Sequence, residues 1–269
     1  MSYSNPAAYE QFMGRWSARL ARSFLRFAGV RDGQHVLDVG CGTGSLSRVL
    51  LAAGATLKVT GVDPVAAYVA FARDAVPEGR AQFQIADAGA LPFLDQTFDA
   101  TLALLVLQDV SHPGKAVREM ARVTKAGGVV ATCLWDFQHG MPMFSLLWQA
   151  AEAVAPRAVA RQRRQNPGPQ HAGVDELKSL WEGCGLQDIR TATLELTMQF
   201  ASFDDYWQPF LGGSTPTSAF AAALDAETGG ALVNELRRNL PKLLPDGSFV
   251  LAARAWAIKG SVPLAKALC

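Results

Sequence analysis

Three glycines at alternate positions follow a short apolar run and an acid. Residues 36–44 read VLDVGCGTG, and Asp38 stands two residues before Gly40. Residues 45–53 then place their apolar side chains on one helical face. Glycine allows a tight turn and the close approach of a ligand, and the free N–H groups at a helix start favour an anionic or polar group. The segment therefore predicts a strand, a glycine turn and a helix that form a nucleotide-cofactor site.

The spacing of the glycines distinguishes two kinds of nucleotide site. A dinucleotide fold has the pattern G-x-G-x-x-G, with its third glycine near the pyrophosphate. Counted from Gly40, that glycine would fall at position 45, which is Ser45; the chain has Gly44 instead. Because a glycine-rich turn alone is weak evidence, the residues around it must decide.

Acids also stand at the ends of the next predicted strands. The apolar run 57–62 ends in Asp63-Pro64, the run 81–86 ends in Asp87-Ala88, and the run 98–107 is followed by Gln108-Asp109. In an open α/β sheet, ligands bind at the carboxyl ends of the strands. A carboxylate at the end of the second strand can accept hydrogen bonds from both hydroxyls of a ribose.

With these motifs in this order, the chain resembles the class I S-adenosylmethionine (AdoMet)-dependent methyltransferases of the bacterial small-molecule type. Relatives of this type include the ubiquinone/menaquinone biosynthesis C-methyltransferases. The resemblance covers about residues 9–136 and rests on VLDVGCGTG (36–44), GVDP (61–64), IADAGALPF (85–93), FDATLALLVLQDVSHP (98–113) and REMARVTKAGGVV (118–130). It implies a methyl transfer from AdoMet, with S-adenosylhomocysteine as the product, to a small-molecule acceptor whose reacting atom (O, N or C) stays open.

The resemblance also implies cofactor-binding positions. In the family, the acid matching Asp38 lies near the amino end of AdoMet, and the acid matching Asp63 binds the ribose. The full set of expected contacts is Asp38, Gly40, Cys41, Gly42, Thr43, Gly44, Asp63, Pro64, Asp87, Ala88, Leu104 and Leu105. In related enzymes an N-terminal segment folds over AdoMet, and an arginine there can pair with the methionine carboxylate. Tyr9, Arg15 and Trp16 are candidates for this role, although they could merely seal the core.

The acceptor site is less well marked. Apolar small-molecule pockets carry few polar groups, so we expect the residues after the fourth and fifth strands and in the later helices to line it: Gln108, Trp135, Phe137, Met141 and Trp207. Aromatic residues at helical spacing are more often core. Aromatic residues in these segments beyond those needed for the core would suit an aromatic or lipophilic acceptor. The sequence lacks an Asn-Pro-Pro-aromatic tetrapeptide after the fourth strand, which argues against methylation of nucleic-acid bases by that arrangement.

Methyl transfer needs mainly alignment of the acceptor, and a base only if the acceptor must lose a proton. The candidate bases near the strand ends are Asp109, His112, Asp136 and His139, each of which is more often an ordinary loop residue. His139 is the weak candidate we retain. Residues 157–164 hold four arginines, typical of a solvated helix face; a lid for an anionic substrate is the alternative.

Composition limits the remaining possibilities. The chain has 269 residues, 49% of them hydrophobic, and a formal charge of +1, so no global basic field is available for nucleic acid. Four scattered cysteines predict neither a disulfide frame nor a zinc site, and we expect no metal. The N-terminus lacks the apolar run of a signal peptide, and no stretch reaches 18 apolar residues. We expect a cytoplasmic monomer or homodimer.

The expected fold is Rossmann-like α/β, with helices on both faces of a seven-stranded, mostly parallel sheet and an antiparallel last strand. We expect one AdoMet-binding domain over residues 1–269, with an N-terminal lid at residues 1–17. Between the sixth strand (186–200) and the seventh (248–258), about 47 residues replace a hairpin loop. This insertion, residues 201–245, predicts a helical cap with helices at 204–210 and 217–239.

Two rival functions remain. An NAD(P)-dependent oxidoreductase shares the strand, glycine turn, helix and second acid, but Ser45 and Asp87-Ala88 count against it. A non-catalytic AdoMet-binding protein has the same fold, and fold does not fix function.

Overall fold

The computed structural model describes residues 5–76, 79–166, 173–212 and 215–264. The chain divides into two compact units, and the expectation of a single AdoMet-binding domain stays a prediction. The sheet unit comprises residues 14–135, 170–194 and 255–269, and the helical unit comprises residues 1–13, 136–169 and 195–254. The first four residues of the expected lid, Gly213 within the expected cap, and Cys269 lie outside the described residues.

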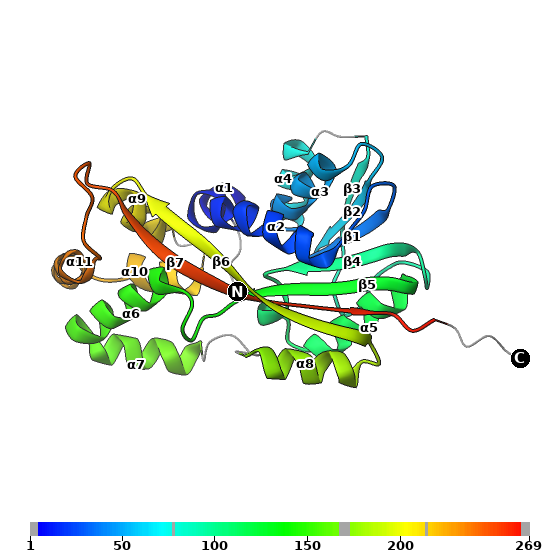
Figure 1. Cartoon of the computed structure of the whole chain (residues 1–269). Coiled ribbons are helices and arrows are strands. Elements are labelled where there is room, and N and C mark those ends of the chain that lie inside the picture. The colour runs from blue at the N-terminus through cyan, green and yellow to red at the C-terminus, as the bar shows by residue number, and fades with distance from the viewer. Residues whose placement is uncertain (1–4, 77–78, 167–172, 213–214, 265–269) are drawn as a thin grey trace, which may run out of the picture. The chain divides into compact units, whose positions relative to one another are not determined.

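Seven strands make one sheet. They are β1 (His35–Val39), β2 (Lys58–Asp63), β3 (Ala81–Ile85), β4 (Phe98–Leu104), β5 (Thr124–Trp135), β6 (Gln187–Phe200) and β7 (Phe249–Ser261). Their order is β3-β2-β1-β4-β5-β7-β6 (Figure 1). The pairs β1–β2, β2–β3, β1–β4 and β4–β5 are parallel, and β7 runs antiparallel to β5. The expected Rossmann-like sheet with an antiparallel last strand is confirmed.

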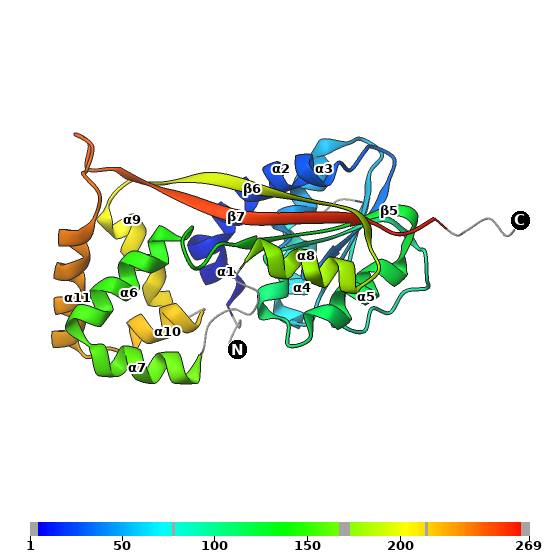
Figure 2. The same ribbon diagram turned by 60° about the horizontal axis from the view of Figure 1, so that its bottom comes forward.

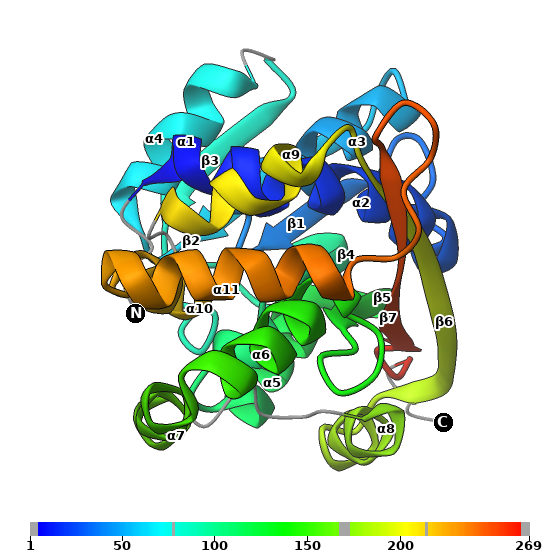
Figure 3. The same ribbon diagram turned by 90° about the vertical axis from the view of Figure 1, so that its left-hand side faces the viewer.

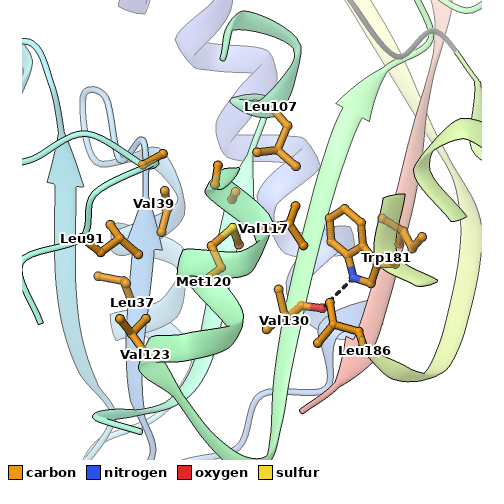
Figure 4. Packing of buried hydrophobic residues seen from close by; sticks show 14 of the residues in the cluster. Leu37, Val39, Leu91, Leu107, Val117, Met120, Val123, Val130, Trp181 and Leu186 are labelled. Atoms are coloured by element: carbon orange, nitrogen blue, oxygen red, sulfur yellow. Dashed lines mark hydrogen bonds between the residues drawn. The ribbon is translucent and has the colours of Figure 1, made fainter. Parts of the chain in front are cut away.

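Helices cover both faces of the sheet unit. They are α2 (Arg15–Ala28), α3 (Ser45–Ala53), α4 (Ala66–Ala75), α5 (Pro113–Val123) and α8 (Val174–Gly183). The first three lie on one face, and α5 and α8 lie on the other (Figures 1 and 3). The amphipathic spacing of α5 buries Val117, Met120 and Val123 against the strands, and the Trp181 indole N–H donates to the Val130 carbonyl at 3.4 Å (Figure 4).

The helical unit has its own core. Its elements are α1 (Pro6–Tyr9), the π-helix η1 (Glu10–Gly14, whose last residue belongs to the sheet unit), α6 (Pro142–Val154), α7 (Pro156–Gln165), α9 (Phe203–Trp207), the 3₁₀-helix η3 (Gln208–Gly212), α10 (Pro216–Ala222) and α11 (Ala226–Asn239). Helix α6 packs against α7 and α11 (Figures 2 and 3). Phe12 meets Phe144 and Phe210 edge to face, with centroids 5.8 and 4.9 Å away. Apolar and aromatic burial therefore holds these short helices together.

The predicted helix over residues 217–239 is wrong. The structure has two helices, because α10 ends at Ala222 and Asp225 starts a new one by accepting the Thr228 backbone N–H at 2.8 Å. A carboxylate cap of this kind satisfies a free N–H of the first turn and competes with helix continuation. The fourth strand also ends earlier than predicted, at Leu104, because Leu105 takes a left-handed conformation with φ of 62°.

Candidate functional site

The glycine turn follows β1 directly. Gly40, Gly42 and Gly44 all have positive φ (67°, 52° and 83°), which side chains other than glycine rarely adopt. The Cys41 N–H donates to the Val62 carbonyl at 2.9 Å, which fixes the turn to the end of β2. Helix α3 then begins at Ser45. A Cβ at Gly42 would meet nothing within 4 Å, so this part of the turn leaves backbone open to a ligand.

Asp38 lies beneath the turn on β1. Its side chain is buried and accepts a hydrogen bond from the Ser47 hydroxyl at 2.6 Å. Burial raises the pKa of Asp38 to about 7, although the bond from Ser47 opposes this. Near neutral pH, this carboxyl can therefore gain or lose a proton, and a nearby cation would favour the charged form.

Asp63, the last residue of β2, is held by two backbone donors. Gly42 N–H donates to Oδ2 at 3.0 Å and Val65 N–H to Oδ1 at 2.9 Å. Burial raises the pKa of Asp63, while these two hydrogen bonds lower it. The carboxylate is fixed beside the glycine turn, and each oxygen keeps further acceptor capacity.

Asp87 and Ala88 follow β3. The Asp87 carboxylate accepts the Gly89 N–H at 2.7 Å, and its carbonyl accepts the Ala90 N–H at 3.0 Å. The resulting turn leaves Asp87 exposed and Ala88 buried. Asp38, Asp63 and Asp87 thus all stand at or near the carboxyl ends of neighbouring parallel strands, as the sequence predicts.

The end of β4 lies against the glycine turn. A Cβ at Gly40 would come within 2.4 Å of a Val106 methyl carbon. The Leu105 N–H donates to the Cys133 carbonyl of β5 at 2.7 Å. After this left-handed residue, Leu107–Asp109 form a 3₁₀-helix that holds Gln108. Leu104 and Leu105 are thereby placed beside the turn.

The comparisons with known proteins identify methyltransferases as the relatives of this chain. A methyltransferase domain model matches residues 37–132. The demethylmenaquinone methyltransferase of Tropheryma whipplei is 31% identical over 180 residues, which span 64% of this chain and 74% of that protein. The O-methyltransferase cnsE of Penicillium expansum is 36% identical over 151 residues, 52% of this chain and 54% of that one. The chain belongs to the class I AdoMet-dependent methyltransferases.

Solved structures share the fold of this methyltransferase. Phosphoethanolamine N-methyltransferase 2 of Haemonchus contortus, solved in complex with S-adenosyl-L-methionine, superposes with a TM-score of 0.60 at 18% identity, over 98% of this chain and 58% of that one. The methyltransferase uses AdoMet and is of the small-molecule type. The comparisons give the oxidoreductase alternative no support.

The N-terminal candidates are divided between the units. Tyr9 ends α1 in the helical unit, whereas Arg15 and Trp16 open α2 in the sheet unit. The Arg15 guanidinium lies over the buried Trp16 ring, 4.4 Å from its centroid, a cation–π contact. The contact of these residues with AdoMet stays a prediction.

The acceptor candidates are divided in the same way. Gln108 and Trp135 belong to the sheet unit; Phe137, Met141 and Trp207 belong to the helical unit. Met141 and Trp207 are buried, and Trp207 stacks on Phe210 with centroids 6.1 Å apart. Much of the aromatic surplus is therefore used in core packing.

The base candidates have different surroundings. His139 is exposed, and its backbone N–H donates to Asp136 Oδ1 at 3.0 Å. Asp136 is buried and also accepts two hydrogen bonds from the Arg254 guanidinium, the Nε bond at 2.8 Å. This pair ties the turn after β5 to β7. Asp109, the last residue of the 3₁₀-helix, and His112, in the loop after it, are both exposed. In the described part of the chain, no group of His, Cys, Asp and Glu could hold a metal ion.

Sequence reasoning missed several supporting residues. Ser47 holds Asp38, and Arg48 donates from its guanidinium to the Thr43 carbonyl at 2.9 Å. Val106 packs on Gly40. The helical periodicity of residues 45–53 marks Ser47 and Arg48 only as polar positions, so no sequence signal could have identified their partners. None of the described helices combines the length and hydropathy that a membrane crossing requires.

Proposed function

We propose that the sheet unit binds AdoMet at the glycine turn and that Asp63 holds its ribose. The observation that carries this proposal is the pair of backbone N–H groups, from Gly42 and Val65, that fix both oxygens of one buried carboxylate. A carboxylate already oriented in this way loses little freedom on accepting two ribose hydroxyls. The open space beside Gly42 admits a ligand that a side chain would exclude.

The other sheet-unit residues complete the proposed site. Asp38 would face the ammonium end of the methionine part, where a positive charge stabilises its ionised form. Asp87 and Ala88 would meet the adenine, and Leu104 and Leu105 would line the sulfonium side. AdoMet, when bound, supplies an electrophilic methyl group on a sulfonium that leaves as a neutral thioether. The chain's own task is to bind, to orient and to exclude water.

We further propose a small, ring-bearing acceptor without a permanent charge. The T. whipplei relative is named for demethylmenaquinone, and other matching proteins are named as O- and N-methyltransferases. The reacting atom therefore stays open, and turnover of an acceptor panel with AdoMet would identify it. Turnover of any acceptor would also exclude a purely binding role.

Asp63→Asn tests the cofactor site. Loss of charge-assisted hydrogen bonds to the ribose should cost about 1.5–3 kcal/mol, a roughly ten- to hundredfold weaker affinity for S-adenosylhomocysteine, measured by calorimetry. Asp99→Asn is the matched control. Asp99 is a carboxylate on the same sheet, but it bonds the His35 N–H at 2.8 Å at the amino end of the strands, so its loss should leave the affinity unchanged. Equal affinity in Asp63→Asn and the parent would overturn the ribose assignment.

A further inference from the structure

Two buried polar atoms at the carboxyl ends of β4 and β5 have no partner. These are the Gln108 side-chain oxygen and the Trp135 indole nitrogen; among the described residues none forms a hydrogen bond with either. Trp135 as a whole is only 4% exposed. Folded proteins rarely leave such groups unsatisfied, because a buried unpaired donor or acceptor costs about 1–3 kcal/mol.

The backbone around these two residues is fixed. β4 and β5 are parallel neighbours with Leu104 opposite Cys133, and Trp135 is the last residue of β5. The left-handed Leu105 turns the chain into the 3₁₀-helix that holds Gln108. A non-glycine residue in this conformation is strained, and such strain is often found at functional sites. The chain is anchored just before Gln108, because Val106 packs on Gly40 and Leu107 is fully buried in the core (Figure 4).

The chemistry of the pair defines what it can recognise. The indole N–H is a donor only, the amide oxygen is an acceptor, and neither carries a charge. A hydroxyl group offers both complements, since its oxygen accepts and its hydrogen is donated. An ionised carboxylate could accept from the indole N–H, but it has no hydrogen to donate to the amide oxygen and would leave Gln108 unpaired.

We propose that Gln108 and Trp135 are positioning residues for a methyl acceptor that bears uncharged ring hydroxyls of the phenol or hydroquinone type. This inference rests on the proposed function, because it concerns the acceptor of the same methyl transfer. The Trp135 N–H donates to a hydroxyl oxygen, and Gln108 accepts a hydroxyl hydrogen. A site built to pair a hydroxyl discriminates strongly against an analogue that lacks it, because its own polar groups then stay unpaired.

The test uses the full-length chain saturated with S-adenosylhomocysteine and two probes of similar shape, 1-naphthol and 1-methylnaphthalene. In the parent, we expect 1-naphthol to bind at least about tenfold more tightly, measured by calorimetry. Gln108→Met and Trp135→Phe should each remove most of this preference and leave the affinity for 1-methylnaphthalene unchanged. Gln82→Met, an exposed residue on β3, is the matched control and should behave as the parent does.

Two further readouts separate the possible failures. The ligand-free melting temperature of Gln108→Met and Trp135→Phe should equal or exceed that of the parent, because each loses an unpaired buried group; a large drop would indicate a structural role. The affinity for S-adenosylhomocysteine should stay within about twofold. A fall in that affinity would assign Gln108 to the cofactor, and a parent that does not distinguish the two probes would overturn the proposal. A parent that fails to bind S-adenosylhomocysteine at all would instead refute the proposed function.

Discussion

The sheet unit and the helical unit treat their buried polar groups differently. In the helical unit, every buried side-chain polar atom of the described residues has a partner: Tyr206 bonds the Met143 carbonyl, and Asp136 bonds Arg254. At the carboxyl end of the sheet unit, Asp38 is buried with a raised pKa, and Gln108 and Trp135 are unpaired. A buried polar group that has a hydrogen-bond partner stabilises the fold. A buried polar group without a partner is typical of a site where a ligand supplies the missing hydrogen bond. The difference supports the proposal that the sheet unit carries the binding site.

The largest expected effect comes from the glycine turn. Gly40→Ala places a Cβ in a left-handed residue, which costs about 1–2 kcal/mol, and drives it into Val106, which overpacks the contact by about 1–3 kcal/mol. The melting temperature should fall by roughly 2–4 °C for each kcal/mol lost. Thermal unfolding followed by circular dichroism measures it.

Gly42→Ala is the matched control for this effect. It has the same positive φ but meets nothing within 4 Å, so it should lose only the conformational cost while its methyl group weakens S-adenosylhomocysteine binding. Destabilisation equal to that of Gly40→Ala would show that packing on Val106 contributes nothing.

The glycine turn shows how much of the fold and of the site can be predicted from the sequence. The pattern of apolar runs, glycines and terminal acids predicts β1 to β5 and the places of Asp38, Asp63 and Asp87, because parallel strands bring their carboxyl ends to one edge. The contact between Gly40 and Val106 was not predictable. These residues are far apart in the chain, and only the strand order β2-β1-β4 brings them together.

Interactions that a sequence pattern does not show explain the other differences between prediction and structure. Residues 217–239 have one continuous helical pattern, but the Asp225 cap divides it, since a side chain that bonds its own backbone can outweigh periodicity. The raised pKa of Asp38 depends on burial by its surroundings, which no short motif encodes. Phe210 and Trp207 of the insertion are buried in the core, and the acceptor role expected of Trp207 stays a prediction.

The second prediction concerns Asp38 and pH. Its native pKa is about 7, whereas an unfolded aspartate has a pKa of about 3.9. Between these values the native protein holds a proton that the unfolded chain releases. The stability from this group is therefore fully present below about pH 4 and is lost as the pH rises through 7, by at most about 1.4 kcal/mol per pH unit.

Asp38→Asn should remove this slope, as urea unfolding at several pH values between 5 and 8 will show. Saturation with S-adenosylhomocysteine should also flatten it in the parent, if the ligand's ammonium group stabilises the charged carboxylate. A parent and an Asp38→Asn variant with parallel pH profiles would contradict the buried-acid interpretation.

The smallest expected change in stability comes from removing a single polar atom from a buried aromatic residue, once in each unit. Tyr206→Phe removes the hydroxyl that donates to the Met143 carbonyl at 2.9 Å, so the helical unit should lose about 0.5–1.5 kcal/mol of stability. The affinity for S-adenosylhomocysteine should not change. Trp135→Phe likewise removes one polar atom from a buried aromatic residue, but that atom has no partner among the described residues, so the melting temperature should hold or rise. Changes of the same sign in both variants would mean that the two units do not differ in the way their buried polar groups are satisfied.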